Sequence, residues 1–246
     1  METTLATAWG FALVLFRATA LCLSAPVLGA TTVPARIRLG VAVVVGWAAF
    51  VGAGSPALPP PETIAGLILA AAAESAIGLA AGLSARLVLE AATAAGSLAG
   101  LSMGLGYGQL IDPSSGTASS AVGQAFGLLA LGVAVGLGLH REAIAWLCRS
   151  VIEVGPGAAV DLPSLLRRVI AHGVLSAGLA VRIAFPILAA ITFGHVLIAA
   201  IGRTAPQLNL QSLGFSIAIL CGGGALYLVA PAATAIAARA ALAAFG

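Results

Sequence analysis

Residues 96–124 decide the fold, and they read GSLAGLSMGLGYGQLIDPSSGTASSAVGQ. Gly96, Gly100, Gly104 and Gly108 recur at every fourth position of an otherwise apolar segment. On a helix, this spacing places the four glycines on one face. A helix face without side chains allows a second helix to approach closely in a lipid-like environment. The pattern therefore predicts a tightly packed helix of a membrane protein.

A polar turn is expected to end the glycine helix. Its residues Asp112, Pro113, Ser114, Ser115 and Gly116 precede a second apolar run that carries no charge. Irregular backbone is tolerated at membrane depth only where protein or a water-filled path surrounds it. We therefore expect this loop to lie where something is let through or held back.

The composition places the whole chain in a membrane. Of the 246 residues, 61% are hydrophobic and 8% are charged, whereas soluble domains carry about 25% charged residues. We expect an all-α integral membrane protein in contact with membrane lipid. The net charge of +3 is not gathered into a basic cluster interleaved with aromatic residues, which argues against a nucleic-acid-binding protein.

Seven apolar stretches predict about six to seven helices, several of them broken or kinked, in a single membrane domain that spans residues 1–246. The stretches are roughly 8–30, 39–53, 62–84, 87–111, 121–139, 170–201 and 213–238. The stretch 39–53 predicts a half-helix, because about 20 residues are needed to cross the hydrocarbon core. The stretch 170–201 contains Pro186, which predicts a kink.

The arginines predict an orientation, because cytoplasmic connections carry an excess of positive charge. If the N-terminus is outside, the outer connections hold Arg203 alone. The inner connections and the tail hold Arg36, Arg38, Arg86, Arg141, Arg149, Arg167, Arg168 and Arg239. This distribution places the polar turn on the outer side.

Catalytic and metal-binding patterns are weak. Gly100-Leu101-Ser102-Met103-Gly104 fits a nucleophile pattern, but that pattern needs a strand-to-helix turn, and here it falls inside a predicted helix. His140, His172 and His195 have no spacing suited to a metal site. We expect no catalytic residue, no cofactor and no metal.

Four charges fall within the apolar stretches, namely Arg17, Glu74, Glu90 and Arg182. Such charges usually face a bundle interior, a partner or water. We expect Glu74 to pair with Arg182, and Glu90 to pair with Arg86 one helical turn away. Two roles stay open, which are assembly of the helices and a gating or proton-sensing role for Glu74.

A second polar turn separates the last two apolar stretches. Arg203, Pro206, Gln207 and Asn209 bring hydrogen-bonding groups and a rigid proline to this position. The turn is either a simple connection or a contact with another chain.

The chain resembles the FliR family of flagellar export proteins and their injectisome counterparts, which belong to the export gate of type III secretion. The resemblance runs nearly end to end. It rests most specifically on the run Ala205-Pro206-Gln207-Leu208-Asn209. Weaker elements support it: Arg17 with Ala25-Pro26-Val27, Val33-Pro34, Arg36 to Arg38, Glu74 with Ile77-Gly78-Leu79, Asp112-Pro113, Gly138-Leu139-His140, Ser150 and Phe185-Pro186.

The resemblance implies a non-enzymatic subunit of the secretion pore, with a FliP-like part at about 1–165 and a FliQ-like hairpin at about 166–246. It implies a pore plug from about Gly106 to Ala121, which includes Gly106, Tyr107, Gly108 and Gln109 besides the polar turn. The implied partners are FliP-like, FliQ-like and FlhB-like subunits, an FlhA-like component and unfolded export substrates. The implied location is the bacterial inner membrane, at a flagellar basal body or injectisome base.

A free-standing secondary transporter of a small solute is the alternative from another class of protein. Such transporters bind their substrate at the midplane between broken helices and often show two similar halves. No convincing internal repeat is visible in the sequence, which favours the export-gate interpretation.

Overall fold

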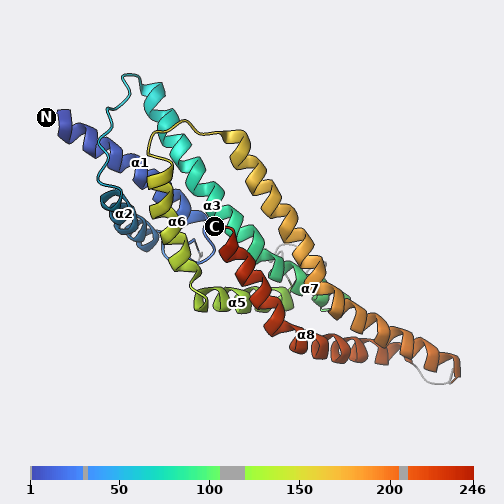
Figure 1. Cartoon of the computed structure of the whole chain (residues 1–246). Helices are drawn as coiled ribbons and strands as arrows, with labels where there is room; N and C mark the ends of the chain where they lie inside the picture. The colour runs from blue at the N-terminus through green and yellow to red at the C-terminus, as the bar shows by residue number, and fades with distance from the viewer. Residues whose placement is uncertain (1, 30–32, 106–119, 205–209) are drawn as a thin grey trace. The chain divides into compact units, whose positions relative to one another are not determined.

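The computed structural model describes residues 2–29, 33–105, 120–204 and 210–246 (Figure 1). All regular structure in these ranges is helical, which confirms the predicted all-α fold. The helices are α1 (Glu2–Ser24), α2 (Ala35–Gly52), α3 (Ile64–Ser102), α5 (Ala121–Gly136), α6 (Leu139–Glu153), α7 (Leu162–Thr204) and α8 (Leu210–Ala243).

Five of these helices are long and apolar enough to cross a membrane, and the number becomes six if α5 and α6 form one interrupted span. The seven predicted stretches overcount because 62–84 and 87–111 lie in one continuous helix, α3. Arg86 separates these stretches in hydropathy but does not end the helix, since arginine is a good helix former. Arg86 therefore lies within a helix and not in a connection. The predicted orientation, which counted Arg86 in an inner connection, is no longer supported.

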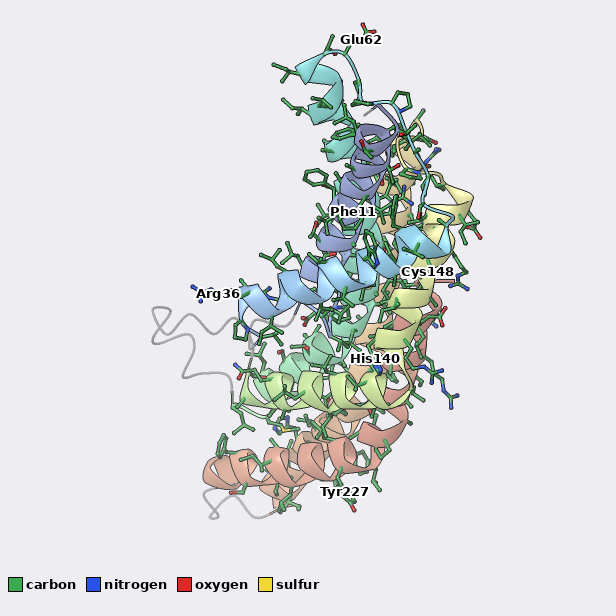
Figure 2. The ribbon with its side chains drawn as sticks, turned by 90° about the vertical axis from the view of Figure 1, so that its left-hand side faces the viewer. Phe11, Arg36, Glu62, His140, Cys148 and Tyr227 are labelled. Atoms are coloured by element: carbon green, nitrogen blue, oxygen red, sulfur yellow. The ribbon has the colours of Figure 1, made fainter. Side chains whose placement is uncertain are left out.

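The helix α2 also differs from expectation. It covers Ala35–Gly52, 18 residues, and qualifies as a span of its own, whereas the stretch 39–53 predicted a half-helix. The difference arises at the start, where Pro34 precedes the helix and Arg36 and Arg38 form part of its first turns. Figure 2 shows Arg36 at this end of α2, directed away from the ribbon. Hydropathy alone missed these turns because they are charged.

The chain forms two compact units. The first unit contains Met1–Val88, Val135–Gly173 and Ala240–Gly246, and the second unit contains Leu89–Ala134 and Val174–Arg239. The helices α3, α5, α7 and α8 each contribute residues to both units.

The first unit is built on an antiparallel pair, α1 and α2. A Cβ atom placed on Gly46 of α2 would lie 3.2 Å from the Cβ of Ala18, so the two helices touch at this point. Further along, the Leu58 N–H donates to the Ala6 carbonyl over 3.1 Å. The connection after α2 is therefore held against the start of α1.

The second unit is built from the last turns of α3 with α5, α7 and α8. Its buried cluster contains Ala99, Met103, Ile187, Ile191 and Ala218, with Ala225 and Leu226 packed against it. Close contacts join Gly194 to Cys221 and Gly222 to Ile191. Between these two contacts the residue number rises along α7 and falls along α8, so this part of the two helices forms an antiparallel hairpin. Tyr227 of α8 points outward and is exposed (Figure 2).

Candidate functional site

A buried ion pair lies at the centre of the first unit. Arg17 of α1 donates through Nε to Oε2 of Glu74 on α3 over 2.6 Å. The two side chains are 0% and 1% exposed. A charge in such a place is stable only when it is paired and its remaining hydrogen-bonding groups are satisfied.

The rest of the Arg17 guanidinium holds the end of α6. Its Nη1 donates to the Ser150 carbonyl over 2.7 Å and to the Ser150 hydroxyl over 3.3 Å. Its Nη2 donates to the Val154 carbonyl over 3.0 Å. Carbonyl groups in the last turn of a helix lack partners within the helix. The Ser150 carbonyl also accepts from the Val154 N–H over 3.0 Å, so Arg17 adds a second donor there and caps the Val154 carbonyl at the end of α6.

Glu74 makes the matching contact on the other side of the pair. Its Oε1 accepts a hydrogen bond from the Gly157 N–H over 2.8 Å, and Gly157 follows the Gly155-Pro156 break after α6. The pair thus joins four segments of the chain, namely α1, α3, the end of α6 and the turn at 155–157.

Small residues bring α3 close enough to α1 for this pair to form. A Cβ atom on Gly78 would lie 3.0 Å from the Ala20 Cβ, and one on Gly82 would lie 2.8 Å from the backbone nitrogen of Ala25. Glu74, Gly78 and Gly82 are spaced by four residues, so they share one face of α3. The four-residue spacing of small residues at 96–108 thus also occurs at 78–82, where it indicates the close approach of α3 to α1. Ser150 belongs to the resemblance, but no pattern in the sequence indicates that Ser150, Val154 and Gly157 contact the pair.

The two predicted ion pairs, Glu74 with Arg182 and Glu90 with Arg86, are wrong. Glu74 pairs with Arg17 and not with Arg182, which is exposed. Glu90 and Arg86 are also exposed, and no ion pair within 4.0 Å joins them in the described part of the chain. Long side chains on a helix surface remain free when no neighbouring element comes near to fix them. Among the residues that the structure describes, none forms an ion pair with Arg182 or Glu90.

The glycine-spaced helix packs against α5 at its first two glycines. A Cβ atom on Gly96 would lie 2.8 Å from the Phe126 Cβ and 2.9 Å from the Gly123 Cα. One on Gly100 would lie 2.6 Å from the Ser120 hydroxyl oxygen. Only a residue without a side chain fits at these two positions.

The helix α3 ends earlier than predicted, at Ser102. Gly104 has a φ of +82° and lies outside the helix. The Leu105 N–H donates to the Gly100 carbonyl and the Gly104 N–H to the Leu101 carbonyl, a Schellman termination that requires a left-handed residue. The third glycine of the series therefore ends the helix instead of packing it.

Several predicted residues lie outside the described part of the chain. They comprise Gly108 of the glycine series, the predicted plug residues Gly106, Tyr107, Gln109, Asp112, Pro113, Ser114, Ser115 and Gly116, and Pro206, Gln207 and Asn209 of the second polar turn. Arg203, at the last turn of α7, is described and exposed. Ser102, of the nucleophile pattern, donates to the Leu98 carbonyl over 2.9 Å, an ordinary bond within a helix.

A cavity of about 350 Å³ lies beside the ion pair in the first unit. Ser150 and Val154 line it together with apolar residues of α3, and Glu153, Asp161 and Arg168 contribute charges. Over the described ranges, no group of three or more His, Cys, Asp or Glu side chains is arranged to hold a metal ion.

These features define a helical protein with five or six candidate membrane spans and a buried ion pair that joins segments of its first unit. Residues 8–243 match the model of the family described as bacterial export proteins, family 1. The chain belongs to this family. It is 26% identical over 211 residues to the flagellar biosynthetic protein FliR of Caulobacter vibrioides, and the alignment covers 86% of this chain and 84% of the relative.

Proposed function

We propose that this chain is a pore-forming subunit of the type III flagellar export gate in the bacterial inner membrane. The observation that carries the proposal is the family match over residues 8–243, which leaves almost no part of the chain unexplained. The similarity to a flagellar biosynthetic protein over most of both chains supports the flagellar branch. The five or six candidate spans are consistent with a membrane location. No feature of the described residues favours the secondary transporter.

The gate would assemble from this chain with FliP-like and FliQ-like subunits, surrounded by an FlhB-like subunit and an FlhA-like component. A FliP-like part at about 1–165 would be followed by a FliQ-like hairpin at about 166–246. The antiparallel contact of α7 with α8 supports the hairpin. Arg182 and Glu90, which form no ion pair with any described residue, lie on helices rich in exposed apolar side chains and would be neutralised by partner subunits. Arg203 and the turn after it would form a further contact with a partner subunit.

The segment from Gly106 to about Ala121 would act as the plug that closes the pore before unfolded substrates pass. Its two flanks are well anchored. The chain leaves α3 through the Schellman turn at Gly104, and Ser120 caps α5 by accepting a hydrogen bond from the Gly123 N–H over 3.0 Å. Because Ser120 also packs on Gly100, the segment starts and ends near the same point. Changes within the segment would therefore leave these two anchors in place.

Deleting Asp112–Ser119 tests the plug. The variant should still co-purify with the FliP-like and FliQ-like subunits, since both anchors remain. It should also make the resting membrane permeable to ions, measured as a loss of membrane potential in cells that overproduce the gate. A replacement of the same residues by a glycine–serine segment of equal length serves as the control for loop length. If the assembled deletion variant leaves the membrane tight, the segment is only a connection.

A further inference from the structure

An open groove of about 480 Å³ lies in the first unit, between the first turns of α1 and the last turns of α2. Pockets that hold small molecules span about 300–1,000 Å³, so the groove is large enough for part of a ligand. It is lined by Thr3, Thr4, Thr7, Ala8, Phe11, Trp47, Phe50 and Ser55. Neither the ion pair nor the proposed plug uses any of these residues.

Three aromatic rings form the apolar part of the groove. The centroid of Phe11 lies 5.2 Å from that of Trp47 and 5.6 Å from that of Phe50, both edge to face. Phe50 is 2% exposed, whereas Trp47 is 55% exposed. Tryptophan gathers at membrane–water interfaces because its ring is apolar and its N–H is polar.

The position of the groove along the helices agrees with such an interface. The helices α1 and α2 are both candidate spans, and the groove lies where the first begins and the second ends. The connection that follows contains four prolines and then Glu62, which Figure 2 shows at the tip of the chain before α3. If α1 and α2 cross the membrane as candidate spans, this end of the pair lies at the boundary between lipid tails and water.

The polar part of the groove consists of hydroxyl groups, and none of its lining residues is charged. The Thr7 hydroxyl donates to the Thr3 carbonyl over 2.8 Å and keeps only its capacity to accept. The Ser55 hydroxyl has no hydrogen-bond partner among the residues that the structure describes. Neutral hydroxyls beside aromatic rings match the glycerol-ester region of a phospholipid, which joins uncharged polar groups to apolar chains.

Ser55 is held in the groove by an unusual backbone conformation. Its φ is +53°, and it is the one residue other than glycine with a positive φ in the described ranges. The Gly54 N–H donates to the Val51 carbonyl and the Ser55 N–H to the Phe50 carbonyl, so Ser55 is the closing residue of a Schellman turn at the end of α2. A strained residue other than glycine suggests that its side chain is needed at this place.

We propose that this groove binds one phospholipid of the surrounding bilayer. An acyl chain lies on Phe11, Trp47 and Phe50, and the ester region accepts a hydrogen bond from the Ser55 hydroxyl. Since no charged side chain lines the groove, binding depends little on the charge of the lipid headgroup. The proposal does not depend on the export function.

Fluorescence quenching tests whether lipid enters the groove. The chain contains three tryptophans, so Trp9→Phe with Trp146→Phe leaves Trp47 as its only one, and an assembly in which Trp47 is also replaced by Phe gives the emission of the partner subunits for subtraction. The full chain, in its natural assembly, is placed in nanodiscs with phosphatidylcholine brominated on its acyl chains. Trp47 should be quenched, and Ala8→Phe, which fills the groove, should remove most of the quenching. Ala48→Phe is the matched control, because Ala48 is exposed on α2 but does not line the groove.

Two outcomes of this experiment overturn the proposal. Equal quenching in the Ala8→Phe and Ala48→Phe variants would mean that Trp47 touches only bulk lipid. Absence of quenching in the assembly would mean that another protein covers the groove. As a control, the melting temperatures of both variants are measured. Values close to that of the unaltered chain show that a lost signal does not come from unfolding.

Ser55→Gly separates lipid binding from stability. Glycine adopts a positive φ without strain, so the variant should melt at a higher temperature than the unaltered chain. It should also retain about fivefold less lipid in native mass spectrometry, the change expected for one lost hydrogen bond. Retention should be similar for phosphatidylethanolamine and phosphatidylglycerol. Undiminished retention, or retention of the anionic lipid alone, would contradict the proposed mode of binding.

Discussion

Replacing Arg17 by methionine removes the guanidinium group and keeps a side chain of similar length in a site that is closed to solvent. Glu74 would then be a carboxylate that is 1% exposed and has lost its cation. Removing one partner of a buried ion pair costs about 3–5 kcal/mol, because the remaining charge is left without compensation. Domains have total stabilities of about 5–15 kcal/mol. We therefore expect Arg17→Met to be severely destabilised.

The double variant Arg17→Met with Glu74→Leu should be less destabilised than the sum of the single variants. It removes both charges and leaves two backbone groups without their hydrogen-bond partners, the Val154 carbonyl and the Gly157 N–H. The Ser150 carbonyl keeps its helical partner, the Val154 N–H at 3.0 Å. Both lost bonds are only partly buried, so each should cost about 1 kcal/mol.

The measurement is a double-mutant cycle of thermal unfolding in detergent, with the amount of folded chain in the membrane as a second readout. Glu142→Gln provides the control. It breaks the ion pair with Arg149. In this pair the Arg149 side chain is 50% exposed and the Glu142 side chain is 38% exposed. A pair of this kind contributes about 0–1 kcal/mol. If Arg17→Met costs no more than Glu142→Gln, or if the cycle shows no coupling, the ion pair does not hold the first unit together.

Four further predictions concern α3, α5 and α7. Gly96→Ala should lower the free energy of unfolding by about 1–3 kcal/mol, because the new methyl group meets the α5 backbone. Gly132→Ala is the control: no atom lies within 4 Å of the new methyl group, so the free energy of unfolding should rise by about 0.5–1 kcal/mol. Gly104→Ala should cost about 1–2 kcal/mol through its left-handed conformation, and no measurable loss would contradict the Schellman termination. Arg182→Gln should leave the melting temperature of the isolated chain unchanged but reduce co-purification with partner subunits; unchanged co-purification would show that Arg182 is not a partner contact. Glu74→Gln should leave any pH dependence of export unchanged if Glu74 only assembles the helices, and a loss of that dependence would favour proton sensing.

The helical membrane fold could be predicted because it depends on local properties of the chain. Long uncharged runs such as 121–136 are recognisable wherever they occur, since transfer to an apolar environment depends on composition. The number of spans was harder to predict, because Arg86 lowers the local hydropathy of α3 without interrupting it. Hydropathy measures the cost of transfer from water, while continuity of a helix depends on backbone propensity.

The four intramembrane charges could be recognised from the sequence, but not their partners. Arg17 and Glu74 are 57 residues apart, and sequence patterns carry no distance between helices. The pairing depends on the close approach of α3 to α1 at Gly78 and Gly82. The carbonyls of Ser150 and Val154 could not be foreseen at all, because every residue has a carbonyl and only the tertiary structure leaves these two within reach of Arg17.

The glycine series at 96–108 shows how sequence and tertiary structure divide the information. The sequence by itself determined that this is a membrane helix with a bare face, because composition and spacing are sufficient for that conclusion. Only the tertiary structure decided that Gly96 and Gly100 pack against α5 while Gly104 ends the helix. The physical reason is that glycine permits both close packing and a left-handed backbone, so identical residues at identical spacing serve different purposes according to what lies beside them.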